Sequence, residues 1–227
     1  MYTLYVANKN YSSWSLRPWV LMRELGIVFD EQVRPFTEGP DLAFGDVSPS
    51  GRFPCLVDGT TVVWDSLSIT EYLAETHREV WPSDRTARAF ARSASAEMHS
   101  GFTTLRNICG MNVGIRVVLA DIPAALAADI ARIDQLWTEG LARFGGPFLA
   151  GPNFTAVDAF FSAVAFRVQT YDLQLSPAAA DYARRLLALS SMQEWYHAAL
   201  EEPWRKTVYE REALAAGRIV ADYRISA

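Results

Sequence analysis

Hydrophobic and polar positions over residues 1–80 alternate between two patterns, one typical of strands and one typical of helices. Short β-rich runs bounded by turn residues indicate strands, and apolar residues at helical spacing indicate helices. The strands are expected at 3–7, 29–36, 55–57 and 60–64, and the helices at 14–25 and 66–77. Asp58-Gly59 joins the last two strands and is typical of a hairpin turn. The predicted order is therefore β-α-β, a turn-rich loop over 37–52, and β-β-α.

From residue 87 onward the pattern is helical throughout. Residues 81–86 include Pro82-Ser83-Asp84 and are expected to form a linker. Apolar residues then recur about every 3.6 positions. Helices are expected at 90–105, 123–144, 155–170, 177–189 and 192–201. The segment 155–170 is apolar nearly all round, which is typical of a buried central helix. The sequence thus predicts an α/β domain over 1–80 followed by an all-helical domain over 87–227.

The composition narrows the classes of protein that fit. Of 227 residues, 50% are hydrophobic and 21% are charged, which is typical of a globular protein with a packed core. The net charge of −5, with scattered arginines, argues against nucleic acid, because phosphate binding needs clustered basic residues. Two cysteines exclude a disulfide framework. Neither a transmembrane stretch nor a signal-peptide pattern is recognisable, so we expect a cytoplasmic protein without membrane contact.

Phe53-Pro54 stands at the entry to the predicted hairpin, where proline is unusual because it cannot donate a ladder hydrogen bond. An ordinary trans proline at a strand start would explain it. Its place after a β-α-β unit instead favours a cis bond, which turns the backbone N–H and C=O of Phe53 outward. We expect these two groups to bind an extended peptide.

Asp65-Ser66 begins the helix predicted at 66–77. Ser66 is expected to cap this helix, and the free N–H groups of the first turn attract an anion such as a carboxylate. Asp65 could hold an ammonium group beside it. Together the two residues would bind an α-amino acid head group; a plain N-cap without a ligand is the alternative.

Three serines, Ser12, Ser13 and Ser15, lie between the first strand and the first helix. A helix N-terminus stabilises a thiolate, and a serine hydroxyl that donates to sulfur lowers the thiol pKa further. A helix cap is the alternative role, and one of the three is expected to take it. A dithiol of the thioredoxin type is excluded because no cysteine stands at this helix start.

Four motifs, in their order and spacing, resemble those of the cytosolic glutathione transferases across nearly the whole chain. They are Ser12-Ser13-Trp14-Ser15-Leu16-Arg17, which is similar to the double-serine motif of the zeta class, the segments 48–54 and 65–73, and Thr155-Ala156-Val157-Asp158. The last resembles the family's capping motif, in which Thr and Asp satisfy free N–H groups reciprocally. The resemblance implies a thioredoxin-like βαβ-ββα domain that binds glutathione, followed by the all-helical domain.

The resemblance also implies roles for individual residues. The residues that activate the glutathione thiol would be Ser12, Ser13 and Ser15, in that order of preference. The residues that bind glutathione would be Arg52, Phe53, Pro54, Asp65 and Ser66. Two departures from the family matter: Asp65 stands where Glu or Gln is usual, and Trp14 replaces the small residue or cysteine of the zeta motif. Zeta-type isomerase activity therefore does not follow from the motif.

The function implied is detoxifying attack of the glutathione thiolate on a small hydrophobic electrophile, held by aromatics such as Trp14 or Phe102. His99 and Arg106 could face the second-substrate pocket, but a solvated helix face is the preferred interpretation for both. The histidine spacing predicts no metal site. Glutathione-dependent isomerisation or peroxide reduction, and a non-catalytic binding protein of the same fold, are alternatives that the sequence leaves open. A homodimer is expected from the family.

Overall fold

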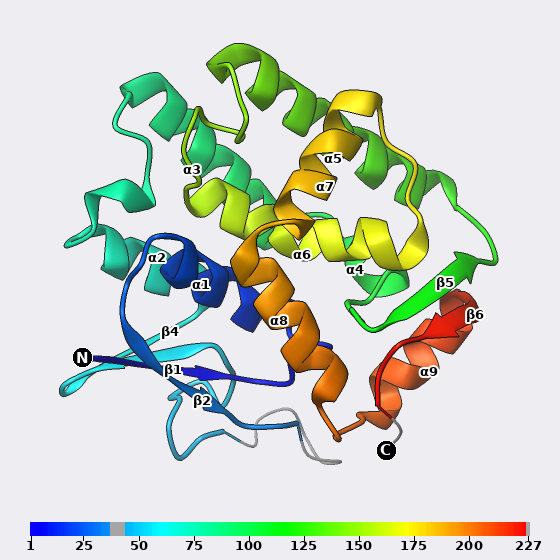
Figure 1. The fold of residues 1–227 in the computed structure, drawn as a ribbon, viewed down its shortest axis with the longest axis horizontal. Helices are drawn as coiled ribbons and strands as arrows, with labels where there is room; N and C mark the ends of the chain where they lie inside the picture. The colour runs from blue at the N-terminus through cyan, green and yellow to red at the C-terminus, as the bar shows by residue number, and fades with distance from the viewer. Residues whose placement is uncertain (37–43, 226–227) are drawn as a thin grey trace.

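The computed structural model describes residues 1–36 and 44–225. A four-stranded sheet, in the order β2-β1-β3-β4, lies at one end of the molecule (Figure 1). Its strands are β1 (Tyr2–Val6), β2 (Phe29–Val33), β3 (Cys55–Asp58) and β4 (Thr61–Trp64), with helices α1 (Ser13–Glu24) after β1 and α2 (Ser66–Ala74) after β4. β1 and β2 are parallel, whereas β3 pairs antiparallel with β1 and β4. The predicted order of elements is confirmed; residues 37–43 of the predicted loop lie outside the described residues.

The two faces of the sheet bury different clusters, because successive side chains of a strand point to opposite sides. Leu4 and Val6 of β1 are fully buried in the main core with residues of α1 and α2. Tyr5 points the other way and packs against a smaller cluster formed by Ala7, Phe44, Phe53 and Cys55. Within it the rings of Phe44 and Phe53 are stacked with centroids 4.1 Å apart. The side chain of Phe53 is therefore anchored, which fixes the backbone at this point.

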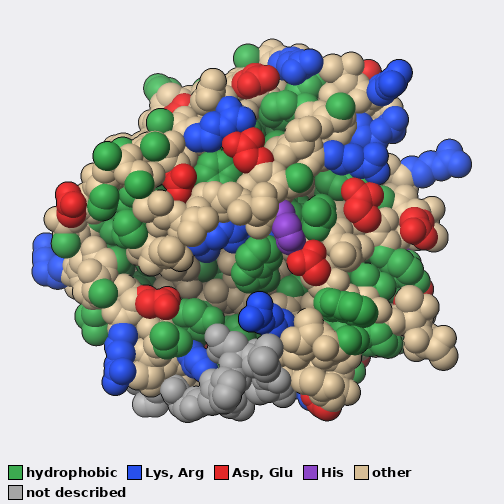
Figure 2. Space-filling view, turned by 180° about the vertical axis from the view of Figure 1, so that it is seen from behind, with side chains coloured by type: hydrophobic (Ala, Val, Ile, Leu, Met, Phe, Trp, Pro, Cys, Tyr) green, Lys and Arg blue, Asp and Glu red, His purple; other side chains and the backbone are tan. Residues whose placement is uncertain are grey.

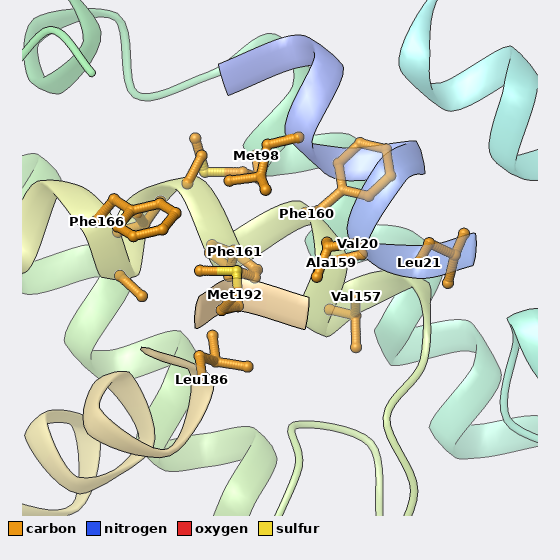
Figure 3. Close-up of a cluster of buried hydrophobic side chains, with 14 of the residues drawn as sticks. Val20, Leu21, Met98, Val157, Ala159, Phe160, Phe161, Phe166, Leu186 and Met192 are labelled. Atoms are coloured by element: carbon orange, nitrogen blue, oxygen red, sulfur yellow. The ribbon is translucent and has the colours of Figure 1, made fainter. Parts of the chain in front are cut away.

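The rest of the chain is mainly helical. After a short 3-10 turn (Arg78–Val80) the helices are α3 (Arg85–Ser100), α4 (Thr103–Ile108), α5 (Ala124–Phe144), α6 (Ala156–Tyr171), α7 (Pro177–Leu187), α8 (Ser190–Glu201) and α9 (Thr207–Ala216). Helix α6 is central, and α1, α3 and α7 pack against it (Figure 1). In the buried cluster of Figure 3, Phe160 and Phe161 of α6 lie near Val20 of α1 and Met192 of α8. Helix α1 thus joins the sheet to the helical region.

Helix α6 begins with the predicted capping box of Thr155 and Asp158. The Asp158 carboxylate accepts hydrogen bonds from the N–H of Thr155 at 2.9 Å, the N–H of Leu149 at 3.0 Å and the hydroxyl of Tyr182 at 2.8 Å. Burial raises the pKa of Asp158 to about 6, although these hydrogen bonds act in the opposite direction. The box therefore holds the helix start, the preceding loop and α7 together.

Two strands interrupt the helical region, where only helices were predicted. β5 (Ile115–Leu119) and β6 (Gly217–Asp222) form a separate antiparallel sheet beside α9 (Figure 1). Both segments are rich in β-branched residues, which favour a pleated strand over a helix. A Cβ at Gly217 would collide with the carbonyl of Val118, so this glycine permits the close pairing.

The helix predicted at 90–105 is two helices in the structure. α3 ends at Ser100, and Phe102 has φ of 56°, a left-handed conformation that ends one helix before α4 begins at Thr103. Helix α3 also begins at Arg85, inside the expected linker. The division into 1–80 and 87–227 stays a prediction, because the main hydrophobic core runs without a break through both parts.

Candidate functional site

The start of α1 places three serines in different surroundings. Ser12 is the N-cap: its hydroxyl oxygen accepts the N–H of Ser15 at 3.3 Å, and its hydroxyl donates to Ser15 Oγ at 2.7 Å. Ser15 is fully buried and its Oγ also accepts the N–H of Ala7 at 3.1 Å. Ser13 is buried, and its side chain makes no hydrogen bond to any of the described residues. Ser12 takes the capping role that the sequence assigned to one of the serines.

The Phe53-Pro54 peptide bond is cis, as predicted. Neither the N–H nor the C=O of Phe53 has a hydrogen bond partner within residues 1–36 and 44–225. Arg52, the preceding residue, is exposed. An extended peptide can therefore bind along this edge, because its own N–H and C=O groups can pair with the free N–H and C=O of Phe53. A second cis bond, Gly146-Pro147, was not predicted.

The start of α2 differs in one respect from the prediction: Asp65, and not Ser66, caps the helix. Asp65 Oδ1 accepts the N–H groups of Leu67 at 2.8 Å and Ser68 at 3.3 Å, while its Oδ2 lies 3.5 Å from His99 Nε2. Asp65 has φ of 75°, a conformation that a residue other than glycine rarely adopts. Ser66 is the first residue of the helix and is fully buried. The cap leaves one carboxylate oxygen of Asp65 directed away from the helix.

Arg17 lies beside the site, although it lines neither of the two hollows described below, and its place there was not predicted. It is almost fully buried in α1, and its Nη1 donates to Ser66 Oγ at 3.4 Å. Its Nε and Nη2 have no hydrogen bond partner in the described part of the chain. Burial lowers the pKa of Arg17, and the neighbouring charges of Arg106 and Arg167 lower it further, whereas Asp65 raises it. A buried guanidinium with free donors beside a serine is suited to hold a carboxylate.

Trp14 contacts two guanidinium groups. Arg17 Cζ is 4.2 Å and Arg106 Cζ is 4.7 Å from the centroids of its indole rings, and His99 meets it edge-on at 5.2 Å. Burial lowers the pKa of His99, and Arg17 and Arg106 act in the same direction, against Asp65. His99 and Arg106 are therefore partly buried against Trp14, and the expectation of a solvated helix face was wrong. The stacked cations hold the indole ring in place.

Two adjoining hollows connect these elements. The first, of about 410 Å³, is lined by Trp14, Ser50, Arg52, Phe53, Pro54, Trp64, Asp65 and Ser66. The second, of about 310 Å³, is lined by Tyr11, Ser12, Trp14, Phe36, Phe44, Arg52, Phe53 and Tyr209. All five residues predicted to bind glutathione line the first hollow, and of the three candidate serines Ser12 lines the second. Trp14, Arg52 and Phe53 line both, so the two hollows lie side by side. Phe102, the other aromatic named from the sequence, is buried and lines neither.

Charge on the face shown in Figure 2 is mixed rather than of one sign. On the face shown in Figure 2, acidic and basic side chains are interspersed among hydrophobic ones.

Within residues 1–36 and 44–225 there is no group of three or more His, Cys, Asp or Glu arranged to hold a metal ion. None of the helices that the structure describes has the length and apolar character needed to cross a membrane.

Residues 11–76, which include the serines, Phe53-Pro54 and Asp65-Ser66, match the family model described as "Glutathione S-transferase, N-terminal domain". This region is a glutathione S-transferase N-terminal domain. The family resemblance predicted from the sequence is confirmed. The zeta-like interpretation of the serine motif stays a prediction.

Individual relatives extend the similarity over more of the chain. A probable maleylacetoacetate isomerase of Caenorhabditis elegans is 26% identical over 183 residues, which cover 77% of this chain and 82% of the relative. Human glutathione S-transferase T1-1 in its apo form matches with a TM-score of 0.65 and 24% identity over 96% of this chain and 100% of that structure. The theta-class enzyme of Xanthomonas axonopodis pv. citri, solved with glutathione bound, matches with a TM-score of 0.63 and 21% identity over 86% and 96% of the two chains. The helical C-terminal part therefore also follows the glutathione transferase fold.

Proposed function

We propose that this protein is a glutathione transferase that binds glutathione along Phe53 and activates its thiol with Ser12. The observation that carries the proposal is that two neighbouring hollows share Trp14, Arg52 and Phe53 and together make one groove along Phe53. One end of this groove holds groups suited to an amino acid head, and the other holds a serine at a helix start. An extended tripeptide fits such a groove because it can present a charged end, a main chain and a thiol in sequence.

The γ-glutamyl end of glutathione carries both a carboxylate and an ammonium group. Ser66 and the free guanidinium donors of Arg17 would bind the carboxylate, and the N–H groups at the start of α2 add to the attraction. Asp65 Oδ2 would accept from the ammonium, since Oδ1 is occupied by the cap. The cysteinyl main chain would pair with the N–H and C=O of Phe53, and Arg52 would contact the peptide from the exposed side.

The thiol would lie against Ser12 at the N-terminal end of α1. For this the Ser12 hydroxyl turns its hydrogen from Ser15 Oγ toward sulfur, while Ser12 Oγ still accepts the N–H of Ser15. Donation to sulfur and the positive end of the helix dipole both favour the thiolate. A thiol pKa lowered by about two from its usual value near 8.5 makes the thiolate the main form at neutral pH.

The second substrate would occupy the second hollow, which is lined mostly by aromatic rings. Tyr11 and Tyr209 stack there with ring centroids 5.1 Å apart, and Phe36 lies 5.7 Å from Tyr209. Such walls favour a flat, apolar electrophile. With an aryl chloride the thiolate forms the carbon–sulfur bond, chloride leaves with its electron pair, and the thiol proton passes to solvent.

The test uses calorimetry with glutathione and conjugation of glutathione to 1-chloro-2,4-dinitrobenzene. We expect the wild-type protein to bind glutathione and Ser12→Ala to lower kcat by about 10²-fold, the scale of losing one preorganised donor. Ser13→Ala should have a smaller effect, and Ser83→Ala, at an exposed position that lines neither hollow, should have none. Unchanged rates in both Ser12→Ala and Ser13→Ala would remove serine from the mechanism.

Isomerisation at the same site is a second candidate, favoured by the similarity to the probable maleylacetoacetate isomerase. Both reactions begin with the thiolate, and they differ in whether glutathione is released at the end. Glutathione binding with turnover of a cis-alkene substrate and no consumption of glutathione would identify the isomerase. Binding without any turnover would identify a non-catalytic protein. A homodimer and a cytoplasmic location stay predictions.

A further inference from the structure

The loop that leads to Ser12, residues 8–11, is held mainly by the C-terminal half of the chain. Trp195 Nε1 donates to the carbonyl of Lys9 at 2.9 Å, and Asn10 Nδ2 donates to the carbonyl of Ala199 at 2.5 Å. On the other side of Asn10, its Oδ1 accepts the N–H of Gly114 at 3.2 Å. Elements more than a hundred residues away therefore determine the path of the chain into the serine motif.

Glu202 makes the central contact of this set. It follows directly after the end of α8, only 5% of its surface is exposed, and its Oε1 accepts the N–H of Lys9 at 2.6 Å. Its Oε2 accepts the N–H of Asn10 at 3.2 Å. One carboxylate thus binds two successive main-chain donors, and a buried N–H group without an acceptor would be strongly unfavourable.

The cations near Glu202 do not compete with the two N–H groups for its carboxylate oxygens. The ammonium group of Lys9 lies 2.5 Å from Glu31 and over the rings of Trp19 and Trp195, so its charge is balanced elsewhere. Arg205 is the other cation that acts on Glu202, and its hydrogen bonds go to main-chain carbonyls. The Glu202 carboxylate is therefore available to the two N–H groups.

A second C-terminal carboxylate holds the residue immediately before Ser12. The Tyr11 hydroxyl donates to Glu210 of α9 at 2.7 Å, and Arg224 donates to both oxygens of Glu210 at 2.6 and 3.0 Å. Glu202 fixes the main chain of the loop and Glu210 fixes the side chain at its end. Both lie outside the matched N-terminal domain.

We propose that Glu202 is a positioning residue for thiol activation: its carboxylate fixes the main chain of Lys9 and Asn10 and thereby sets the place of the Ser12 hydroxyl. The inference rests on the proposed function, because it assigns a purpose to the position of Ser12. Loss of the Glu202 carboxylate should therefore impair activation of the thiol at Ser12. Binding of the γ-glutamyl end at Ser66, which is on a different helix, should not change.

The experiment compares Glu202→Gln with Glu201→Gln, a matched variant at the adjacent exposed position. A glutamine amide accepts one N–H but turns a donor toward the other, so the loop loses one contact with little change in volume. With glutathione and 1-chloro-2,4-dinitrobenzene, Glu202→Gln should lower kcat by at least about tenfold, because displacements of about 1 Å cost up to about 10²-fold. The KM for glutathione should stay within about twofold of the wild-type value. Glu201→Gln should match the wild type in both.

Two further readouts separate positioning from a general loss of structure. The pH profile of kcat/KM reports the apparent pKa of the thiol, which should rise by about one in Glu202→Gln and stay unchanged in Glu201→Gln. Amide hydrogen exchange of a peptide covering residues 8–12, measured without glutathione, should become at least about tenfold faster in Glu202→Gln only. If Glu202→Gln does not fold, Glu202→Asp, which keeps the charge but is one methylene shorter, should show the same effects to a smaller degree.

The failures of the two proposals are distinguishable. An active wild-type protein in which Glu202→Gln has the kcat, pH profile and exchange of Glu201→Gln overturns the positioning role alone. A parallel rise in the KM for glutathione that accounts for the whole loss in kcat/KM overturns it as well. A wild-type protein that neither binds nor converts glutathione overturns the proposed function and, with it, the catalytic purpose of Glu202.

Discussion

Arg17 Nη1 donates to Ser66 Oγ at 3.4 Å, which joins the middle of α1 to the first residue of α2. The remaining guanidinium donors, Nε and Nη2, have no partner within the described residues. A buried charge without a full set of hydrogen bonds is unfavourable for folding, because the lost hydration is not replaced. The arrangement is understandable if the missing partner is the carboxylate of a ligand.

Replacing Arg17 should therefore weaken glutathione binding without weakening the fold. Charge-assisted hydrogen bonds contribute about 1.5–3 kcal/mol, so Arg17→Met should raise the Kd for glutathione by about tenfold or more. Its free energy of unfolding should equal or exceed that of the wild type, since a hydrophobic side chain replaces a buried cation whose Nε and Nη2 have no hydrogen bond partner among the described residues. Calorimetry and urea unfolding measure the two quantities, with exposed Arg143→Met as the control. A large loss of stability with unchanged affinity would assign Arg17 to the fold instead.

Ser15 accepts the hydroxyl hydrogen bond of Ser12, and a second prediction concerns its effect on stability. Its Oγ accepts the N–H of Ala7 and the hydroxyl of Ser12, so Ser15→Ala leaves a buried main-chain donor unpaired. We expect a loss of about 1–2 kcal/mol in the free energy of unfolding. Ser13→Ala, where the hydroxyl has no partner among the described residues, should change it by less than about 0.5 kcal/mol. Equal losses in the two variants would contradict the distinction that the hydrogen bonds draw between these serines.

The N-terminal elements were predictable because local signals and the order of elements agreed. The hairpin after Asp58 was recognisable from a few adjacent residues, as was the capping box at Thr155 in the helical part. The cis bond at Pro54 was predicted from the order of the elements around it. β5 and β6 were missed because a helical period was assumed for everything after the linker. The β-branched run over Ile115–Leu119 was the available strand signal, but its pairing partner lies about a hundred residues away in the chain.

The candidate site was predictable only where its residues belong to motifs. Asp65 and Ser66 were identified as a pair, but which of them caps α2 depends on backbone angles that the pair alone does not determine. Arg17 was present in the quoted serine motif, yet its role depends on its distance from Ser66 across the fold. Glu202 has no local signal at all, because the two N–H groups that it binds come from residues at the other end of the sequence.

The capping box gives a prediction about stability alone. Asp158→Ala would remove the acceptor of the Thr155 and Leu149 N–H groups and of the Tyr182 hydroxyl, all of them buried. We expect a loss of about 3 kcal/mol in the free energy of unfolding, because several buried donors lose their acceptor together. The exposed Asp181→Ala should stay within about 0.5 kcal/mol of the wild type in the same urea titration. A loss below about 1 kcal/mol for Asp158→Ala would mean that water replaces the carboxylate.

The pH dependence of stability offers an independent test of the Glu202 contacts. Burial raises the pKa of Glu202 to about 7 from the usual 4.5, although the N–H groups of Lys9 and Asn10 and the charges of Lys9 and Arg205 act in the opposite direction. The folded protein therefore binds this proton more tightly than the unfolded chain. Stability from this group is present at low pH and is lost as the pH rises from about 4.5 through about 7.

Glu202→Gln has no titrating group at this position, so the wild type should lose stability relative to it as the pH rises. Between pH 6 and pH 8, a range above the pI of about 5.3, we expect a relative loss of about 1 kcal/mol. Urea unfolding at the two pH values measures it, and the difference between the wild type and Glu201→Gln should not change. If the difference between the wild type and Glu202→Gln also stays constant, Glu202 is fully ionised throughout, and its carboxylate is better stabilised by Lys9 and Asn10 than its burial implies. A relative gain for the wild type would require a pKa above 6 in the unfolded chain, far from the usual value for glutamate.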